Sequence, residues 1–224
     1  MIHNNIFRNT LKGLSILAAV CLVFTLSACS DDDDDDNDDT TSSDTTSSDT
    51  TYVNGYAAVD LGLSVKWATM NVGAESPEDY GDYFEWGETE TKDGSSTVTY
   101  GVEMDDIAGN AGYDAATANW GGSWRMPTYA EMNELVDDCT WEWTTQNDVN
   151  GYLVTGSTGN SIFLPAAGEL QGKQVEEDVW YGNYWTSTPY EDDATAYYLE
   201  FGYSFHGVGN VDRFLDFSVR PVSE

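Results

Sequence analysis

The feature that most constrains this chain is a long stretch without apolar residues. From residue 30 to residue 51 the sequence contains only Asp, Asn, Ser and Thr. Such a segment buries too little apolar surface to offset the entropy of folding, and its like charges repel one another. We therefore expect residues 29–51 to form an extended polar tether, and any packed core to lie outside it.

The segment before the tether is typical of an export signal. Arg8 and Lys12 precede the apolar run LSILAAVCLVFTL, and no acidic residue occurs among the first thirty residues. The run is shorter than the roughly 20 residues that a membrane-spanning helix needs, so it indicates a signal peptide that is removed. We predict that residues 1–28 are this signal.

The junction between signal and tether carries a second motif. The residues Leu26-Ser27-Ala28-Cys29 resemble the bacterial lipobox, in which the cysteine is acylated and becomes the new N-terminus. Acyl chains at Cys29 would anchor the protein to a membrane without spanning it. The residues that follow resemble the signal that sends lipoproteins to the outer face of the outer membrane: Ser30, Asp31, Asp32, Asp33 and Asp34. A solvated spacer is the alternative interpretation of these aspartates.

Composition limits the partners of the remaining residues, 52–224, which we expect to form one domain. They hold 30 acidic and six basic residues, a balance of −24, together with all eight tryptophans and all fourteen tyrosines. This charge repels phosphate backbones, so nucleic acid is excluded as a partner. It favours cations, basic surfaces or neutral sugars.

Cysteine usage excludes a disulfide-stapled domain. Cys21 leaves with the signal and Cys29 is the predicted lipid site, so only Cys139 remains in the folded part. There is then no intramolecular disulfide and no thiolate metal cluster. We interpret Cys139 as a buried small hydrophobic residue near Trp141.

The domain reads as strands and loops with one clear helix. Its apolar residues come in short runs rich in β-branched and aromatic types, bounded by Gly, Asn, Asp and Ser, which predicts strands. In PTYAEMNELVDD, Thr128 and Glu131 have the spacing of a capping box, which predicts a helix over residues 128–138. A shorter helix is expected over DAATANW, from Asp114. The fold class is therefore α+β.

Six segments in order carry a family resemblance: VDLGLSVKWATMNVG, YGDYFEWGET, DAATANWGGSWRMPTYAEMNELVDDCTWEW, SIFLPAAG, YWTSTPY and FSVRPV. Together they resemble the FISUMP (Fib_succ_major paralogous domain) family of bacterial lipoproteins, which is similar to the C-type lectin-like fold. The resemblance runs from about Val59 to Val222. It implies a domain whose ends lie close together, with small twisted antiparallel sheets, one or two helices and a loop-rich half.

The resemblance also bears on ligands. The Glu-Pro-Asn, Gln-Pro-Asp and Trp-Asn-Asp triplets of calcium-dependent lectins are absent here, so similarity to that fold does not establish sugar binding. Within this frame we interpret four tryptophans as core or loop-pinning residues: Trp120, Trp124, Trp143 and Trp185.

Residues for catalysis or metal binding are sparse. His206 is the only histidine after the signal, and we expect a surface contact from it instead of a general base. Glu85 and Glu88 could serve as the two carboxyls of a glycan hydrolase, but solvated surface charge is the default interpretation. We expect no cofactor. A weak structural calcium ion has candidate ligands in residues 103–106 and in Glu191, Asp192 and Asp193.

The segment GYSFHGVGNVDRFLD, residues 202–216, has neither the period of 2 of a strand nor the period of 3.6 of a helix. This absence of a period is typical of an exposed loop. In C-type lectin-like proteins this region faces the ligand, and some bacterial relatives diversify it at asparagine codons, a process that yields no Lys, Glu, Gln, Met or Trp. None of these types occurs here. We predict a recognition surface made of Tyr203, Phe205, His206, Asp212, Arg213, Phe214 and Asp216. The alternative is a fixed strand pair with Phe205 and Phe214 pointing inward.

These observations predict a surface-displayed lipoprotein that binds a ligand, either a glycan or a surface protein, without catalysis. In one form of this prediction, the protein is a receptor whose C-terminal loops are genetically diversified. The alternatives are a glycan hydrolase acting through Glu85 and Glu88, and a structural component of a surface assembly.

Overall fold

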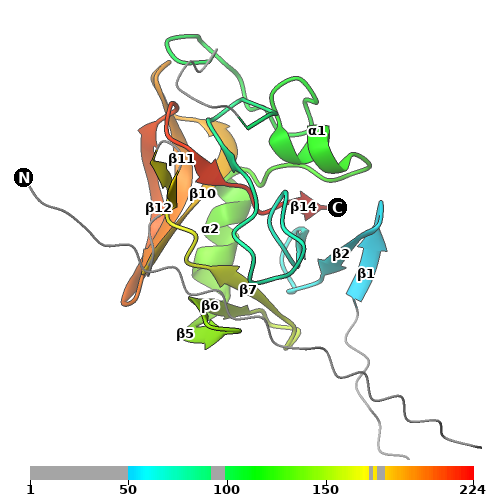
Figure 1. The fold of residues 1–224 in the computed structure, drawn as a ribbon. Coiled ribbons are helices and arrows are strands. Elements are labelled where there is room, and N and C mark those ends of the chain that lie inside the picture. The colour runs from blue at the N-terminus through cyan, green and yellow to red at the C-terminus, as the bar shows by residue number, and fades with distance from the viewer. Residues whose placement is uncertain (1–49, 92–98, 172–173, 176–179) are drawn as a thin grey trace, which may run out of the picture. The chain divides into compact units, whose positions relative to one another are not determined.

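The computed structural model describes residues 50–91, 99–171, 174–175 and 180–224 (Figure 1). The predicted signal, the lipidation residue Cys29 and the predicted sorting residues 30–34 lie outside the described residues. The described residues belong to a compact unit that runs from Thr46 to Glu224. Neither helix within them has the length and apolar character that crossing a bilayer requires.

The largest sheet has five strands, in the order β12-β11-β10-β13-β4. The antiparallel ladders β10–β11 and β11–β12 make up most of it, whereas β13 runs parallel to β10. The three long strands form one layer in Figure 1. The members are β4 (Tyr83–Phe84), β10 (Tyr181–Pro189), β11 (Thr195–Gly202), β12 (Phe205–Asp212) and β13 (Phe217–Ser218).

A second sheet holds both ends of the described chain. Its order is β1-β2-β3-β14, so the first and last strands belong to the same sheet. Because β1 begins at Thr50, the folded part starts before the expected boundary at Tyr52. The members are β1 (Thr50–Val53), β2 (Tyr56–Val59), β3 (Lys66–Ala68) and β14 (Val222–Ser223).

The third sheet is an antiparallel meander of β5 (Thr140–Gln146), β6 (Val149–Thr155) and β7 (Ser161–Pro165). The β5–β6 turn consists of Asn147 and Asp148, whose φ values are 47° and 65°. Two residues with positive φ make the tight hairpin turn that matches strand twist, and Asn and Asp tolerate this conformation best after glycine. A two-stranded ribbon joins β8 (Leu170–Gln171) to β9 (Gln174–Val175).

Both predicted helices are confirmed. Helix α2 (Tyr129–Asp138) begins at the predicted capping box, in which Thr128 Oγ1 accepts from the Glu131 N–H and Glu131 accepts from the Thr128 N–H. Arg125 holds the same carboxylate, with N–O distances of 2.6 and 2.8 Å. Helix α1 (Ala115–Trp120) begins at Asp114, whose carboxylate accepts from the Thr117 N–H. The fold is thus α+β, as predicted.

The five-stranded sheet separates two hydrophobic cores because neighbouring residues of a strand face opposite sides. Trp185 and Phe217 enter one core with Trp120 and Trp124. On the other side, the second core joins α2, through Met132 and Leu135, to the β5–β7 meander; the five-stranded sheet contributes Tyr184, Leu199 and Phe201. Trp120, Trp124 and Trp185 are buried as predicted, but Trp143 is only partly buried.

A buried arginine connects two of the sheets. Arg220 is fully buried, and its guanidinium donates to Asn71 Oδ1 at 2.8 Å and to the carbonyls of Ala68 and Phe163 at 3.1 and 3.0 Å. Ala68 belongs to β3 and Phe163 to β7, so one side chain joins the terminal sheet to the meander. Burial lowers the pKa of Arg220 to about 10, so the group remains charged at neutral pH.

We predict that Arg220→Lys lowers the free energy of unfolding by about 2 to 4 kcal/mol. An ammonium cannot reproduce the planar fork, and each buried acceptor left unsatisfied costs about 1–3 kcal/mol. Urea denaturation of the full chain measures the change. Arg125→Lys is the matched control, because its pair with Glu131 is closer to solvent and should cost less than about 1 kcal/mol. Equal losses in the two variants would contradict the role given to Arg220.

Candidate functional site

The residues predicted to bind ligand do not form one loop. Residues 205–212 are strand β12, paired with β11 over its full length from Gly202↔Phe205 to Thr195↔Asp212. The expectation of an exposed irregular loop is therefore wrong for these positions. Gly207 and Gly209 hide the period of two, because they supply no side chain to one face of the strand.

Strand β12 also divides the predicted set into two groups. Tyr203, Phe205 and His206 lie at one end of the strand, whereas the remaining four residues lie at or beyond the other: Asp212, Arg213, Phe214 and Asp216. Eight strand residues span more than about 20 Å. The inward orientation considered for both phenylalanines is also wrong, since Phe205 and Phe214 are 53% and 42% exposed.

The prediction that Arg213 contacts a ligand is wrong because this side chain is fully buried. Its guanidinium carbon lies 4.5 Å from the centroid of the Trp86 ring. The guanidinium donates to four carbonyl oxygens at 2.9 to 3.2 Å, those of Thr99, Val102, Asp192 and Thr195. Arg213 therefore ties together loops that are distant in sequence.

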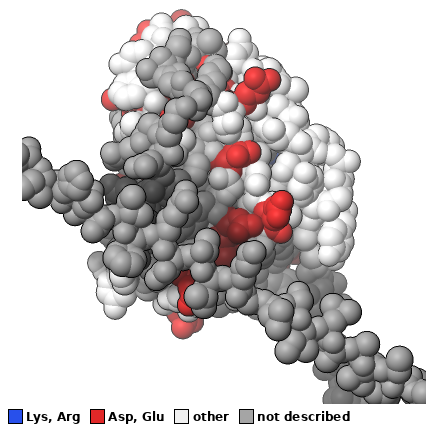
Figure 2. Space-filling model, in the orientation of Figure 1, with Lys and Arg blue, Asp and Glu red and all other residues white. Residues whose placement is uncertain are grey.

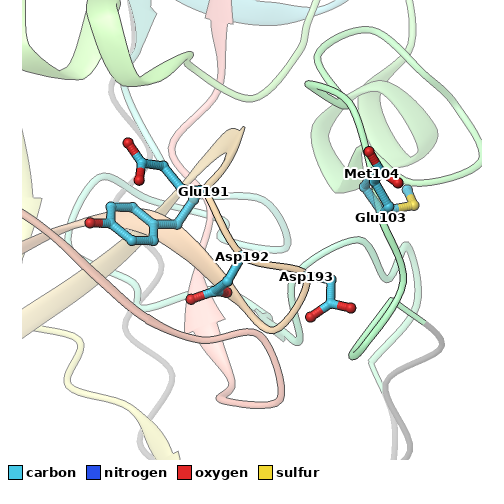
Figure 3. A pocket seen from close by; sticks show the side chains of 6 residues that line it. Glu103, Met104, Glu191, Asp192 and Asp193 are labelled. Carbon is cyan, nitrogen blue, oxygen red and sulfur yellow. The ribbon is translucent and has the colours of Figure 1, made fainter.

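The two segments considered for calcium meet in a cavity of about 440 Å³ (Figure 3). It is lined by Glu103, Met104, Tyr190, Glu191, Asp192 and Asp193. The carboxylates of Glu191, Asp192 and Asp193 point in different directions in Figure 3. Asp192 Oδ1 already accepts from the Ala194 and Thr195 N–H groups and the Thr195 hydroxyl, and these bonds lower the pKa of Asp192.

No set of three or more His, Cys, Asp or Glu side chains in the described ranges is arranged to hold a metal ion. The acidic side chains that line this cavity therefore do not form a defined ligand set for the calcium ion considered as a possibility.

The other end of β12 joins a cluster of aromatic rings that we call the aromatic seam: Trp141, Trp143, Trp180, Tyr203 and His206. Trp143 is its centre, with the Trp180 ring nearly parallel at 6.3 Å and 13° and the Tyr203 ring edge-on at 5.8 Å and 76°. The Trp141 and His206 rings are stacked, with centroids 4.4 Å apart and planes 9° apart.

The seam packs against the second core. The Trp143 ring meets the buried rings of Tyr152 and Phe201 edge-on, at 5.1 and 6.5 Å. Such perpendicular contacts are a favoured geometry for aromatic pairs and add to the energy of burial. The base of the seam is therefore fixed by the packing of β6 and β11.

Strand register places Trp180 and Tyr203 together. Tyr181 pairs with Gly202, so the residue before β10 and the residue after β11 lie side by side. The Tyr152 hydroxyl donates to the Gly202 carbonyl at 3.0 Å and lies 3.3 Å from that of Tyr203. A Cβ at Gly202 would lie 2.6 Å from the Phe205 ring, so a larger residue there would require this exposed ring to move.

Solvent reaches the outer part of the seam. Trp180 is 55% exposed and Tyr203 is 66% exposed. Phe205 is exposed as well, but it alternates with His206 along β12 and so faces the other side of the strand. Contiguous exposed aromatic surface on a folded protein marks an interaction site more often than isolated exposed residues do. Of the predicted residues, Tyr203 and His206 thus belong to the seam, whereas Phe205 lies on the other face of β12.

Sequence reasoning missed Trp143 and Trp180 as members of the site. The alternation in TWEWTT places Trp141 and Trp143 on one face of a strand, and this signal was available. The contact of Trp180 with that face depends on the packing of β10 against the meander, which no local pattern reveals.

The structure also places five other residues that were singled out from the sequence. Glu85 and Glu88 are buried, so the interpretation as solvated surface charge is wrong, and neither lines the cavity described above. Cys139, predicted to be buried, is only partly buried; it packs against the same core as Trp141, and burial raises the pKa of its thiol. Asp212 and Asp216 are half-buried, and burial raises the pKa of Asp216.

Comparison with known protein families gives a match to part of the chain. Residues 126–222 are similar to a family described as a domain of unknown function (DUF8237), and this span contains the whole seam together with Arg213 and Arg220. No curated protein and no solved structure matches the chain.

We predict that the stability of the fold depends on His206 between pH 7 and pH 5. Burial lowers the pKa of His206 below its ordinary 6.5. The unfolded chain then binds a proton at a higher pH than the folded chain, so stability falls as the pH drops through this range. His206→Phe keeps a ring on Trp141 and removes the titration. Only the wild type loses stability through this titration, so the Tm of the variant minus the Tm of the wild type should increase from pH 7 to pH 5. A difference that does not change with pH would contradict the assignment.

Proposed function

We propose that this protein is a bacterial lipoprotein, anchored through Cys29 and displayed on the outer face of the outer membrane, that binds a ligand without catalysis through the aromatic seam. The observation that carries the proposal is the exposure of Trp180 and Tyr203 beside Trp143, on a base of buried rings. Aromatic residues in fixed positions are the usual anchors of recognition surfaces.

The anchoring part of the proposal rests on the sequence. The lipobox-like Leu26-Ser27-Ala28-Cys29 follows an apolar run, and the acidic residues after it have the pattern of an export signal. Because residues 30–49, which precede β1, are polar throughout, a tether of this kind would hold the binding domain away from the lipid surface. Ligands on other surfaces would then be within reach.

We further propose that the domain is of the FISUMP type with a C-type lectin-like fold. The α+β class, the small sheets, the two helices of the described residues and the shared sheet of β1 and β14 are consistent with it. Since the calcium-binding triplets of lectins are absent, the seam is proposed to act independently of calcium.

Binding without catalysis fits the chemistry of the seam. Its members offer flat apolar faces, and the two carboxyls considered for glycan hydrolysis, Glu85 and Glu88, are not among them. His206 is stacked on Trp141, and its lowered pKa keeps most of it neutral at pH 7. Rings that are already packed lose little conformational entropy when a ligand arrives, so more of the contact energy remains for affinity.

Diversification along the whole of residues 202–216 is difficult to reconcile with the packing of this segment. Arg213 is buried, and a side chain at Gly209 would lie 3.2 Å from the Tyr198 ring. Variation that preserves the fold is confined by these contacts to exposed positions such as Tyr203 and Phe205.

We predict that the double substitution Trp180→Ala and Tyr203→Ser weakens ligand binding at least about tenfold, since aromatic hot spots contribute about 2 kcal/mol or more each. The full chain in detergent micelles, applied to an array of glycans and surface proteins, measures retention on each spot. Thermal unfolding should change little, because both side chains are more than half exposed.

Tyr100 and Phe214 provide the matched control. They form another exposed aromatic pair, with centroids 5.4 Å apart, and Phe214 lies beyond the opposite end of β12. Replacing both with serine should leave retention unchanged. Retention that survives loss of the seam, or that falls equally in both double variants, would contradict the proposed site.

A further inference from the structure

We infer that the aromatic seam binds an uncharged glycan chain, laid across the open rings between β5 and the β11–β12 hairpin. This inference rests on the ligand-binding role proposed above and names the chemical class of the ligand. It follows from the size, the shape and the charge of the surface.

The exposed aromatic area is small. A large aromatic side chain presents about 150–250 Å², so the exposed fractions of Trp180 and Tyr203 amount to roughly 180–300 Å². A stable protein–protein interface needs about 800 Å² from each partner. The area suits a narrow ligand that covers a few rings, and it is too small to be the whole contact surface of a protein partner.

The arrangement of the rings is repetitive. Trp141 and Trp143 lie two residues apart on β5, so their backbones are about 7 Å apart along the strand. Each has a nearly parallel neighbour, His206 for the first and Trp180 for the second. A polymer of ring-shaped units can repeat the same contact along such a row, as sugars do when the C–H groups on one side of their puckered rings meet the electron-rich faces of aromatic side chains.

The charge near the seam argues against an ionic ligand of either sign. The seam has no Lys or Arg, and the domain carries a balance of −24, so an anionic polymer is repelled. The visible face of the described residues in Figure 2 shows acidic and no basic side chains.

Nor do the nearby carboxylates serve a cation at the seam. Glu142 alternates with Trp141 and Trp143 on β5, so it faces the opposite side of that strand. Glu200 lies on the face of β11 away from Phe201, where it accepts from the Tyr198 hydroxyl at 3.0 Å. A second copy of the domain is disfavoured by the same net charge.

The test titrates the full chain in detergent micelles with soluble unbranched hexasaccharides, and follows tryptophan fluorescence and heat of binding. The neutral probes are hexamers of glucose, mannose and xylose, and the acidic probe is a hexamer of galacturonate. We expect at least one neutral hexamer to bind, its trimer to bind more weakly, and the acidic hexamer to bind at least about tenfold more weakly than the best neutral one at low salt.

Two variants assign the binding to the seam. Trp180→Ala should weaken binding of the neutral hexamer at least about tenfold, and Trp180→Phe should recover part of the loss because it restores a ring. An unchanged near-UV circular dichroism spectrum away from the Trp180 signal, together with an unchanged Tm, confirms that the fold persists. Equal binding of acidic and neutral hexamers, or an affinity for the neutral hexamer that does not change in Trp180→Ala, overturns the inference.

Failure of this inference differs from failure of the proposed function. If no neutral hexamer binds but the seam double variant loses retention on protein spots of the array, the glycan is wrong and the binding role stands. If no spot shows retention that depends on the seam, the binding role itself is wrong.

Discussion

Two buried arginines hold this fold together, and the rest of the structure depends on the hydrogen bonds that they make. Arg220 joins β3 to β7 through backbone carbonyls and Asn71, and Arg213 joins the loops around Thr99 and Asp192. In a chain with so many carboxylates, neutral oxygens are the partners in these bonds. A buried carboxylate would bring a second large desolvation cost, whereas carbonyls of the fold need a donor in any case.

The hydrogen bonds of these two arginines help to determine where the proposed binding surface lies. With the terminal sheet joined to the meander, the second core is enclosed by α2, β5–β7 and one face of the five-stranded sheet. The core ends at Tyr152 and Phe201, and Trp143 continues it toward solvent. Trp180 and Tyr203 are then exposed because they are the next residues outward. The seam is thus the open end of a packed core, which gives it both rigidity and accessibility.

Much of the fold follows from local sequence patterns, and the departures have a common cause. The capping box of Thr128 and Glu131 and the cap at Asp114 involve neighbours in sequence, so both helices could be predicted. Arg213 could not be assigned, because its partners lie about 18 to 114 residues away and an arginine between aspartate and phenylalanine resembles a surface residue. Strand β12 was missed because Gly207 and Gly209 remove the alternation on which strand prediction depends. The seam itself needs β10 and β5 to meet, which is a property of tertiary packing.

Hydroxyl-radical footprinting of cells that display the full chain tests the central claim, that recognition takes place at the seam. Oxidation of each aromatic side chain is measured by mass spectrometry, with the cells free and then attached to the surface that they bind. The account predicts that attachment protects Trp180 and Tyr203 and leaves Tyr52 and Tyr113, also exposed, unchanged. Protection of Tyr100 and Tyr190 near the acidic cavity, with Trp180 and Tyr203 oxidised as before, would contradict it.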